Sequence, residues 1–412
     1  MDIAISVSPG RRRGFPLMNR CTGAILAALF LLGAGALPAH AITLNGRTST
    51  QALWFSDEFG ADHCDLSQYV RFHARQFNAA DTVSISGYGR VWGDTKGGEV
   101  DGRLYYLYLD KKELVKKTDI RLGRQFFFVS AGSGIVDGAR LDTRLLGPVA
   151  ITVVGGRHVM FDTNGEATRQ GDAAMAVQVS LADIPGFSAD LSYFASRNEN
   201  ALAREIIGFS ASKRLSKYGE LYTQLRVDLL SKVWSEIQVG ARTAIVPKLT
   251  LNAEFFRTIP VFDATSIFSV FAVERFQEVL FRAQYDFSPK VSLSGEYRNE
   301  NFGGDDTANV GEFGIRYRPK DGLSFYGAGI WREGTGGNLL GFELSGDMAI
   351  RKMFTLSAGV QHDSFRRELM TSYDSGTRFW VGGEARLRKN ISAAARMENT
   401  ISQQFNKYVM AS

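Results

Sequence analysis

The chain has 412 residues, with 43 glycines, only 9 prolines and a formal net charge of +5 at pH 7. All-β barrels of this length can form a single unit, so length does not require several domains. Residues 1–41 hold four Arg and one Asp, and without them the charge falls to +2. This near-neutral balance excludes the basic surface typical of nucleic-acid-binding proteins.

Residues 18–41 have the order of a secretory signal peptide, with Arg20, then an apolar run at 24–37, then small residues. The apolar run is too short to cross a bilayer, which needs about 20 residues. We therefore expect Met18 to be the initiator and cleavage to follow Ala41. After the signal no apolar run is long enough for a membrane helix.

Residues 277–299 show the pattern that most of the chain repeats. Phe281 and Tyr285 lie among apolar residues that alternate with polar ones such as Arg282 and Asp286. Because successive side chains of a strand point to opposite faces, the segment predicts one apolar and one charged face. The alternation resumes after the turn at 288–290, so we expect a hairpin.

The same alternation predicts 21 strands, with boundaries accurate to a few residues. They are expected at 43–55, 68–76, 82–92, 103–110, 119–128, 138–146, 149–155, 172–182, 187–196, 204–214, 219–229, 233–245, 249–257, 277–287, 291–299, 310–319, 323–332, 338–350, 353–363, 377–388 and 391–399.

Short and long connections alternate between these strands. The long ones are expected at 56–67, 93–102, 129–137, 156–171, 197–203, 258–276, 300–309, 333–337 and 364–376. Tight turns at one end and long loops at the other are typical of a hairpin meander in an outer membrane, with the tight turns in the periplasm.

A soluble sandwich or propeller would also show alternating faces. However, strands of ten to thirteen residues exceed the usual five or six and match the roughly 9 to 11 that cross a bilayer when tilted. Aromatic residues near strand ends, including Trp54, Trp92, Tyr317 and Trp331, agree with a membrane interface. We therefore predict an all-β, transmembrane antiparallel up-and-down β-barrel over residues 42–412.

The signal, the hairpin rhythm and the charged inner face resemble Gram-negative outer-membrane β-barrels, in particular porin-like channels, although no short motif points to one family. The resemblance implies an even strand number, of about 22 (20 to 22). Residues 407–412 look like the start of a twenty-second strand that is cut short; a strand count wrong by one is the alternative.

The resemblance also implies passive diffusion of small hydrophilic solutes or ions through a charged aqueous lumen in the outer membrane, without enzymatic chemistry, metal or cofactor. An alternative is a barrel that sheathes a partner such as a multihaem cytochrome, or another periplasmic or outer-membrane protein. A plugged, energy-coupled transporter is disfavoured because strands begin directly after Ala41.

The charged positions on the polar face are the candidate pore-lining residues. They are Arg140, Asp142, Arg144, Arg282, Asp286, Glu296, Arg298, Glu343, Asp347, Arg396 and Glu398. Such groups can line an aqueous path and set its field, or can form cross-strand pairs that keep the interior hydrated.

Two segments depart from the alternation. Residues 124–138 contain three consecutive phenylalanines and then small residues, and either fold inward to narrow a pore or form an ordinary surface loop or bulge. The constriction candidates there are Phe128, Ser130, Gly132, Gly134 and Asp137. Residues 258–276 are unusually apolar for a loop, and either tuck into the lumen, contact a partner or belong partly to strands.

An enzyme would need an organised acid–base set. The nearest candidates are His158 with Asp162 and His362 with Asp363, both at strand-to-loop junctions, where solvated surface histidines are common. The acidic stretch around His63 and Cys64 matches no established metal-site spacing. The sequence therefore predicts no catalytic site.

Overall fold

A computed structural model describes fourteen stretches of the chain. They are residues 42–56, 62–78, 80–94, 100–115, 117–145, 147–162, 165–216, 218–244, 246–266, 274–351, 353–367, 372–388, 391–402 and 408–411. The expected signal peptide at 1–41 lies outside these residues. Within them, no helix has the length and apolar character needed to span a membrane.

The described chain is built from strands. They are β1 (Thr43–Ser56), β2 (Asp62–Arg75), β3 (Val83–Asp94), β4 (Val100–Val115), β5 (Thr118–Val129), β6 (Gly132–Arg144), β7 (Val149–His158), β8 (Phe161–Asp162), β9 (Gly165–Glu166), β10 (Ala173–Ile184), β11 (Phe187–Asn198), β12 (Ala201–Ser216), β13 (Gly219–Asp228), β14 (Val233–Thr243), β15 (Leu249–Thr258), β16 (Phe276–Ser288), β17 (Val291–Gly303), β18 (Asp306–Lys320), β19 (Leu323–Gly334), β20 (Asn338–Ile350), β21 (Phe354–Arg366), β22 (Asp374–Arg388), β23 (Ile391–Ser402) and β24 (Tyr408–Ala411).

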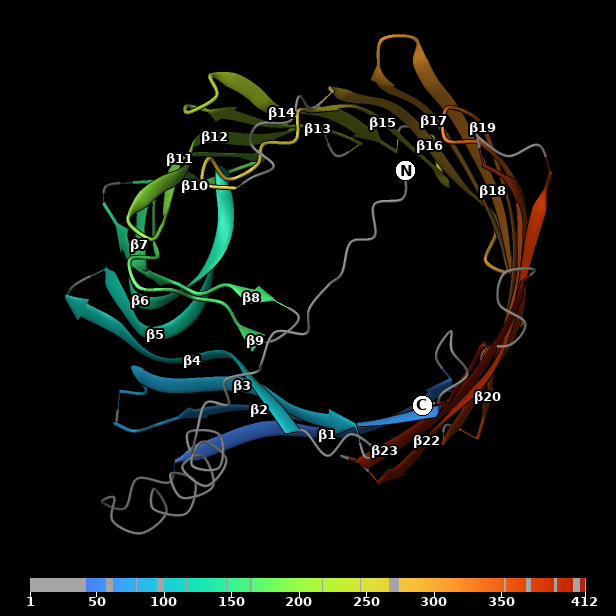
Figure 1. Cartoon of the computed structure of the whole chain (residues 1–412), viewed down its shortest axis with the longest axis horizontal. Coiled ribbons are helices and arrows are strands. Elements are labelled where there is room, and N and C mark those ends of the chain that lie inside the picture. Colours follow the sequence, from blue (N-terminus) through green and yellow to red (C-terminus); the bar gives the residue numbers. More distant parts are fainter. Residues whose placement is uncertain are drawn as a thin grey trace, which may run out of the picture.

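These strands form one 22-stranded antiparallel sheet and a separate two-stranded hairpin, β8–β9. Each large-sheet strand pairs with its neighbours in the chain, and β7 pairs with β10 across the small hairpin. At the other end, β1 pairs with both β2 and β24, the latter at Trp54 and Phe55, so the sheet returns to its own start. Figure 1 shows the resulting ring. The predicted up-and-down barrel of about 22 strands is confirmed.

All 21 predicted strands have a counterpart in the sheet, and the short strand β24 supplies the expected twenty-second. The connections alternate as predicted, so the ring has a short-turn end, where β2 joins β3, and a long-loop end, where β7 joins β10. The main error lies at the long-loop end, where several predicted loops are strands. The predicted loop at 300–309, for example, shrinks to Gly304 and Asp305 because β17 and β18 continue past the expected boundaries.

The two faces of the sheet follow from the register. Phe281 on β16 lies opposite Tyr297 on β17, and Arg282 lies opposite Glu296. The apolar face is the outer one, and its side chains are exposed in the isolated chain, with Phe281 at 54% and Phe313 at 58% of full exposure. A continuous apolar exterior of this kind requires a surrounding hydrocarbon phase to cover it.

Candidate functional site

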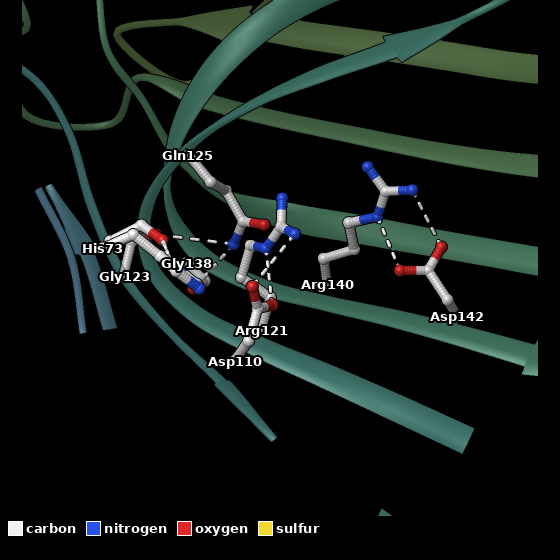
Figure 2. Close-up of polar contacts among 9 residues, drawn as sticks. His73, Asp110, Arg121, Gly123, Gln125, Gly138, Arg140 and Asp142 are labelled. Atoms are coloured by element: carbon white, nitrogen blue, oxygen red, sulfur yellow. Dashed lines mark hydrogen bonds and ion pairs between the residues drawn. The ribbon is translucent and has the colours of Figure 1, made fainter. Parts of the chain in front are cut away.

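The inner face of β4 to β7 carries two forked ion pairs side by side (Figure 2). Arg121 on β5 donates two hydrogen bonds to Asp110 on β4, at 2.7 and 3.2 Å. Arg140 on β6 donates two to Asp142, at 2.8 and 2.9 Å. Asp142 also accepts a hydrogen bond from the Thr152 hydroxyl at 2.6 Å. Two-point contacts of this kind fix both the position and the plane of each guanidinium group.

A second charged group crosses β16, β17 and β18. Arg282 donates from Nε to Glu296 at 2.6 Å, and Arg298 lies 3.0 Å from the same carboxylate and 3.1 Å from Glu312. On β22 and β23, Arg378 and Arg396 both approach Glu398, at 3.6 and 3.1 Å. Acidic and basic side chains are therefore paired at three places on the inner wall.

The predicted pore-lining residues fall into two sets. Seven of them form the ion pairs described above: Arg140, Asp142, Arg282, Glu296, Arg298, Arg396 and Glu398. The other four, Arg144, Asp286, Glu343 and Asp347, form no ion pair with another described residue. Asp286 and Asp347 are exposed, so their charges are directed to the surrounding solvent.

The β5–β6 hairpin does not continue as a straight part of the wall. Its tip, Ser130–Ala131, lies on the inner face of strands several positions further round the ring. The Ser130 hydroxyl donates to the Gly208 carbonyl at 2.9 Å and lies 2.8 Å from the Ser192 hydroxyl. Arg226 on β13 donates to the Ser130 carbonyl at 2.9 Å. We call residues 124–137 the inward hairpin.

An apolar cluster lies between the inward hairpin and the wall. The hairpin supplies Phe127 and Val136, which are almost fully covered, and the wall supplies Val154, Ala176 and Phe194 among others. Phe127 packs against Phe194 with ring centroids 5.8 Å apart. This cluster has the burial expected of a protein core, so the hairpin is firmly held.

Glycines allow the hairpin to bend. A Cβ on Gly138 would lie 2.1 Å from the Gly155 carbonyl oxygen, and one on Gly208 would lie 2.2 Å from the Ala131 nitrogen. Gly123 has a φ of 120°, a conformation that other residues rarely adopt. Side chains at these positions would separate the hairpin from the wall.

The structure shows where the five constriction candidates lie. The predicted loop 129–137 is wrong, because Gly132, Gly134 and Asp137 belong to β6 and pair with β5. Small residues here permit a bent strand and close contact, which sequence alone does not distinguish from a loop. Ser130 forms the buried tip, whereas Phe128 is 75% exposed and points away from the wall contact.

The β8–β9 hairpin projects into the ring beside the inner face of β4 (Figure 1). Arg103 on β4 donates to the Asp162 carbonyl at 2.9 Å, and its guanidinium lies 4.7 Å from the centre of the Phe161 ring. Arg124 donates to Asp137 at 2.7 and 2.8 Å and to Glu166 at 2.9 Å. Arg124 therefore joins the inward hairpin to β8–β9.

The apolar segment 258–276 contributes a third contact at the long-loop end. The predicted boundaries are correct within one residue, since β15 ends at Thr258 and β16 begins at Phe276. Ala264 donates to the Ala203 carbonyl at 2.9 Å, and Asp263 forms an ion pair with Arg204. The described part of this loop is thus held against β11 and β12 at the long-loop end of the ring.

The histidines do not form a catalytic arrangement among the described residues. The His158 Nδ1 atom is buried without a hydrogen-bond partner there, and His362 Nδ1 lies 2.8 Å from the Thr377 hydroxyl. His63 lies 3.0 Å from Asp94. No group of three or more metal-ligating side chains occurs in the described stretches.

Sequence reasoning missed several inner-face residues, above all Arg90, Arg103, Arg121, Arg124 and Arg226. Asp110 and Arg121 do lie at alternate positions of predicted strands, so the alternation could have identified them. Arg124 could not be found in this way. By alternation it belongs to the apolar face of its strand, and it contacts residues inside the ring only because the strand bends at Gly123.

No family model and no curated protein matches the chain. In structure it is similar to the translocation pore of the P pilus usher PapC, with a TM-score of 0.50 and 10% identity over 90% of this chain and 98% of that one. It is also similar to Pseudomonas aeruginosa OpdQ, with a TM-score of 0.46 and 10% identity over 90% of this chain and 97% of that one.

A further similarity is to Pseudomonas aeruginosa OpdK, solved with vanillate, with a TM-score of 0.46 and 12% identity over 89% of this chain and 100% of that one. At such identities a likeness concerns the fold alone. The fold that this chain shares with the PapC translocation pore is a single large antiparallel β-barrel.

Proposed function

We propose that this chain is an outer-membrane channel for the passive diffusion of small hydrophilic solutes or ions. The observation that carries the proposal is the opposition of the two faces of the ring. The outer face exposes side chains such as Phe281 and Phe313, and the inner face carries alternating ion pairs such as Arg282 with Glu296. A barrel of this size leaves room for water inside.

The inward hairpin and β8–β9 together form the constriction of this channel. Both lie inside the ring, and Arg124 connects them through Asp137 and Glu166. Because the hairpin is also anchored by the contacts of Ser130, the constriction is a fixed part of the lumen. A fixed constriction selects solutes by size and by contact with its exposed groups, including Phe128.

The orientation follows from the two ends of the ring. Short turns, such as the one between β16 and β17, face the periplasm, and the long-loop end with β8–β9 faces the outside. Solutes from outside then meet the constriction first. The alternative of a barrel that sheathes a multihaem cytochrome draws no support from the similar structures.

Liposome swelling tests this proposal. Vesicles reconstituted with the purified protein should swell in small sugars and amino acids, and the rate should fall steeply with solute size. Vesicles without protein are the control. Equal rates with and without correctly inserted protein would contradict a solute channel.

A further inference from the structure

Three pairs of arginines face each other directly across neighbouring strands on the inner wall. They are Arg47 with Arg71, Arg90 with Arg103, and Arg121 with Arg140. Like charges in directly opposite positions destabilise a sheet. Each pair therefore needs a nearby negative charge.

Among the described residues, a carboxylate forms an ion pair with only one of the three arginine pairs. Arg121 is paired with Asp110 and Arg140 with Asp142. No carboxylate of the described residues forms an ion pair with Arg90 or Arg103, and the same holds for Arg47 and Arg71. The guanidinium groups of these two pairs are therefore not neutralised by an ion pair with a described carboxylate.

Aromatic rings hold Arg90 and Arg103 in place without neutralising them. Their guanidinium carbons lie 4.6 and 5.5 Å from the centre of the Trp92 ring, Arg90 on the same strand β3 and Arg103 on the neighbouring strand β4. Arg90 also lies over Tyr69, and Arg103 over Phe161. Stacking of this kind fixes the plane of each guanidinium group but leaves its net charge.

Some N–H donors of these two guanidinium groups have no acceptor among the described residues. Each donates from Nη2, Arg90 to the Ser67 hydroxyl at 2.8 Å and Arg103 to the Asp162 carbonyl at 2.9 Å. Each Nε is covered and has no partner among the described residues, so it is out of reach of a solute. Neither Nη1 bonds to another described residue. Two oriented cations therefore each retain an unused Nη1 group on a half-buried aromatic surface.

We propose that Arg90 and Arg103 form a binding site for an oxyanion, the carboxylate or phosphate group of a solute, on the inner face of β3 and β4. The free Nη1 groups of the two facing guanidinium groups can donate to two oxygens of one anionic group. Arg47 and Arg71 add positive potential on the adjoining strands. The supply of such a solute through the lumen rests on the proposed channel, whereas the binding itself does not.

Titration calorimetry on the full chain in detergent tests the site, with inorganic phosphate, acetate and chloride as probes. We expect saturable binding of phosphate or acetate that chloride does not match. The ratio of phosphate to acetate affinity shows which oxyanion the site prefers. In the double variant Arg90→Gln/Arg103→Gln the affinity should fall at least tenfold.

The matched control is Arg121→Gln/Arg140→Gln. It removes the same charge from an opposed arginine pair whose members form ion pairs with Asp110 and Asp142. It should retain the oxyanion affinity. Equal weakening in both double variants, equal affinity for chloride, or no binding to the wild type would overturn the proposal. Because the opposed charges in Arg90 and Arg103 repel, their removal should not prevent folding, which a heat-shift gel assay checks.

This experiment separates the site from the channel. A protein that conducts ions but binds no oxyanion would refute the site alone. A protein that binds phosphate through Arg90 and Arg103 but never conducts would refute the channel alone.

Discussion

Arg226 on β13 donates a hydrogen bond of 2.9 Å to the carbonyl of Ser130, which belongs to the tip of the β5–β6 hairpin 96 residues earlier. This contact crosses β7, β10, β11 and β12 on the inside of the ring. It therefore connects the β5–β6 hairpin to β13, beyond these four strands of the ring. The same contact fixes how far the hairpin reaches into the lumen.

Displacement of the inward hairpin should widen the channel. In Gly208→Val the new side chain would occupy the place of the Ala131 backbone, where a Cβ alone would lie 2.2 Å from the nitrogen. We expect a higher single-channel conductance, a larger solute limit in liposome swelling and a stability loss of about 1–3 kcal/mol from overpacking. Gly376→Val is the matched control, because a Cβ there meets open space. Unchanged conductance in Gly208→Val would contradict the assigned role of the hairpin.

The contact between the two inner hairpins should depend on Arg124. Its side chain is only 12% exposed and serves both Asp137 and Glu166, so Arg124→Ala leaves two carboxylates without their cation. We expect a loss of about 1.5–3 kcal/mol from these charged hydrogen bonds and more frequent current fluctuations as β8–β9 moves. Arg144→Ala, at an exposed position without an ion pair, should behave as wild type. Identical current traces for the two variants would count against this link.

Two substitutions on β16 test which face of the sheet contacts lipid and which faces the lumen. Phe281→Arg places a charge on the lipid side and should cost about 2–4 kcal/mol near the bilayer midplane. Gln284→Arg puts the same residue on the inner face of the same strand and should cost little. Unfolding in denaturant from lipid vesicles measures both, and equal stabilities would show that the faces are assigned wrongly.

Acid should loosen the loop that carries β8–β9. Asp172 precedes β10 and is 3% exposed. Burial alone would raise its pKa, but backbone N–H groups of Arg169 and Glu199, at 2.6 and 2.8 Å, outweigh that effect and lower the pKa. A lowered folded-state pKa means that the stabilisation is present above the unfolded value of about 3.9 and is lost as pH falls through the folded pKa.

Hydrogen exchange at the amides of Arg169 and Glu199 measures this effect after correction for the intrinsic rate. Protection should fall at low pH in the wild type. In Asp172→Asn it should be weaker at neutral pH and insensitive to acid. Acid-sensitive protection that persists in Asp172→Asn would assign the effect to another group.

The sequence predicts the barrel well because alternation and turn chemistry are local. Phe281 and Arg282 identify the two faces without knowledge of any distant residue, and the same pattern locates all 21 predicted strands. From the sequence, an inward fold of residues 124–137 is only one of two alternatives. Its position depends on contacts between Ser130 and residues such as Gly208 and Arg226, which lie far along the chain. Likewise, the opposed pair Arg90 and Arg103 becomes evident only from the register between β3 and β4.

Planar-bilayer recording of the refolded protein is the most direct test of whether this barrel is a channel. We expect discrete, stable conductance steps, with larger steps in Gly208→Val than in Gly376→Val. Protein that is shown to be inserted in the bilayer, yet produces no conductance steps, would contradict the assignment of this barrel as a channel.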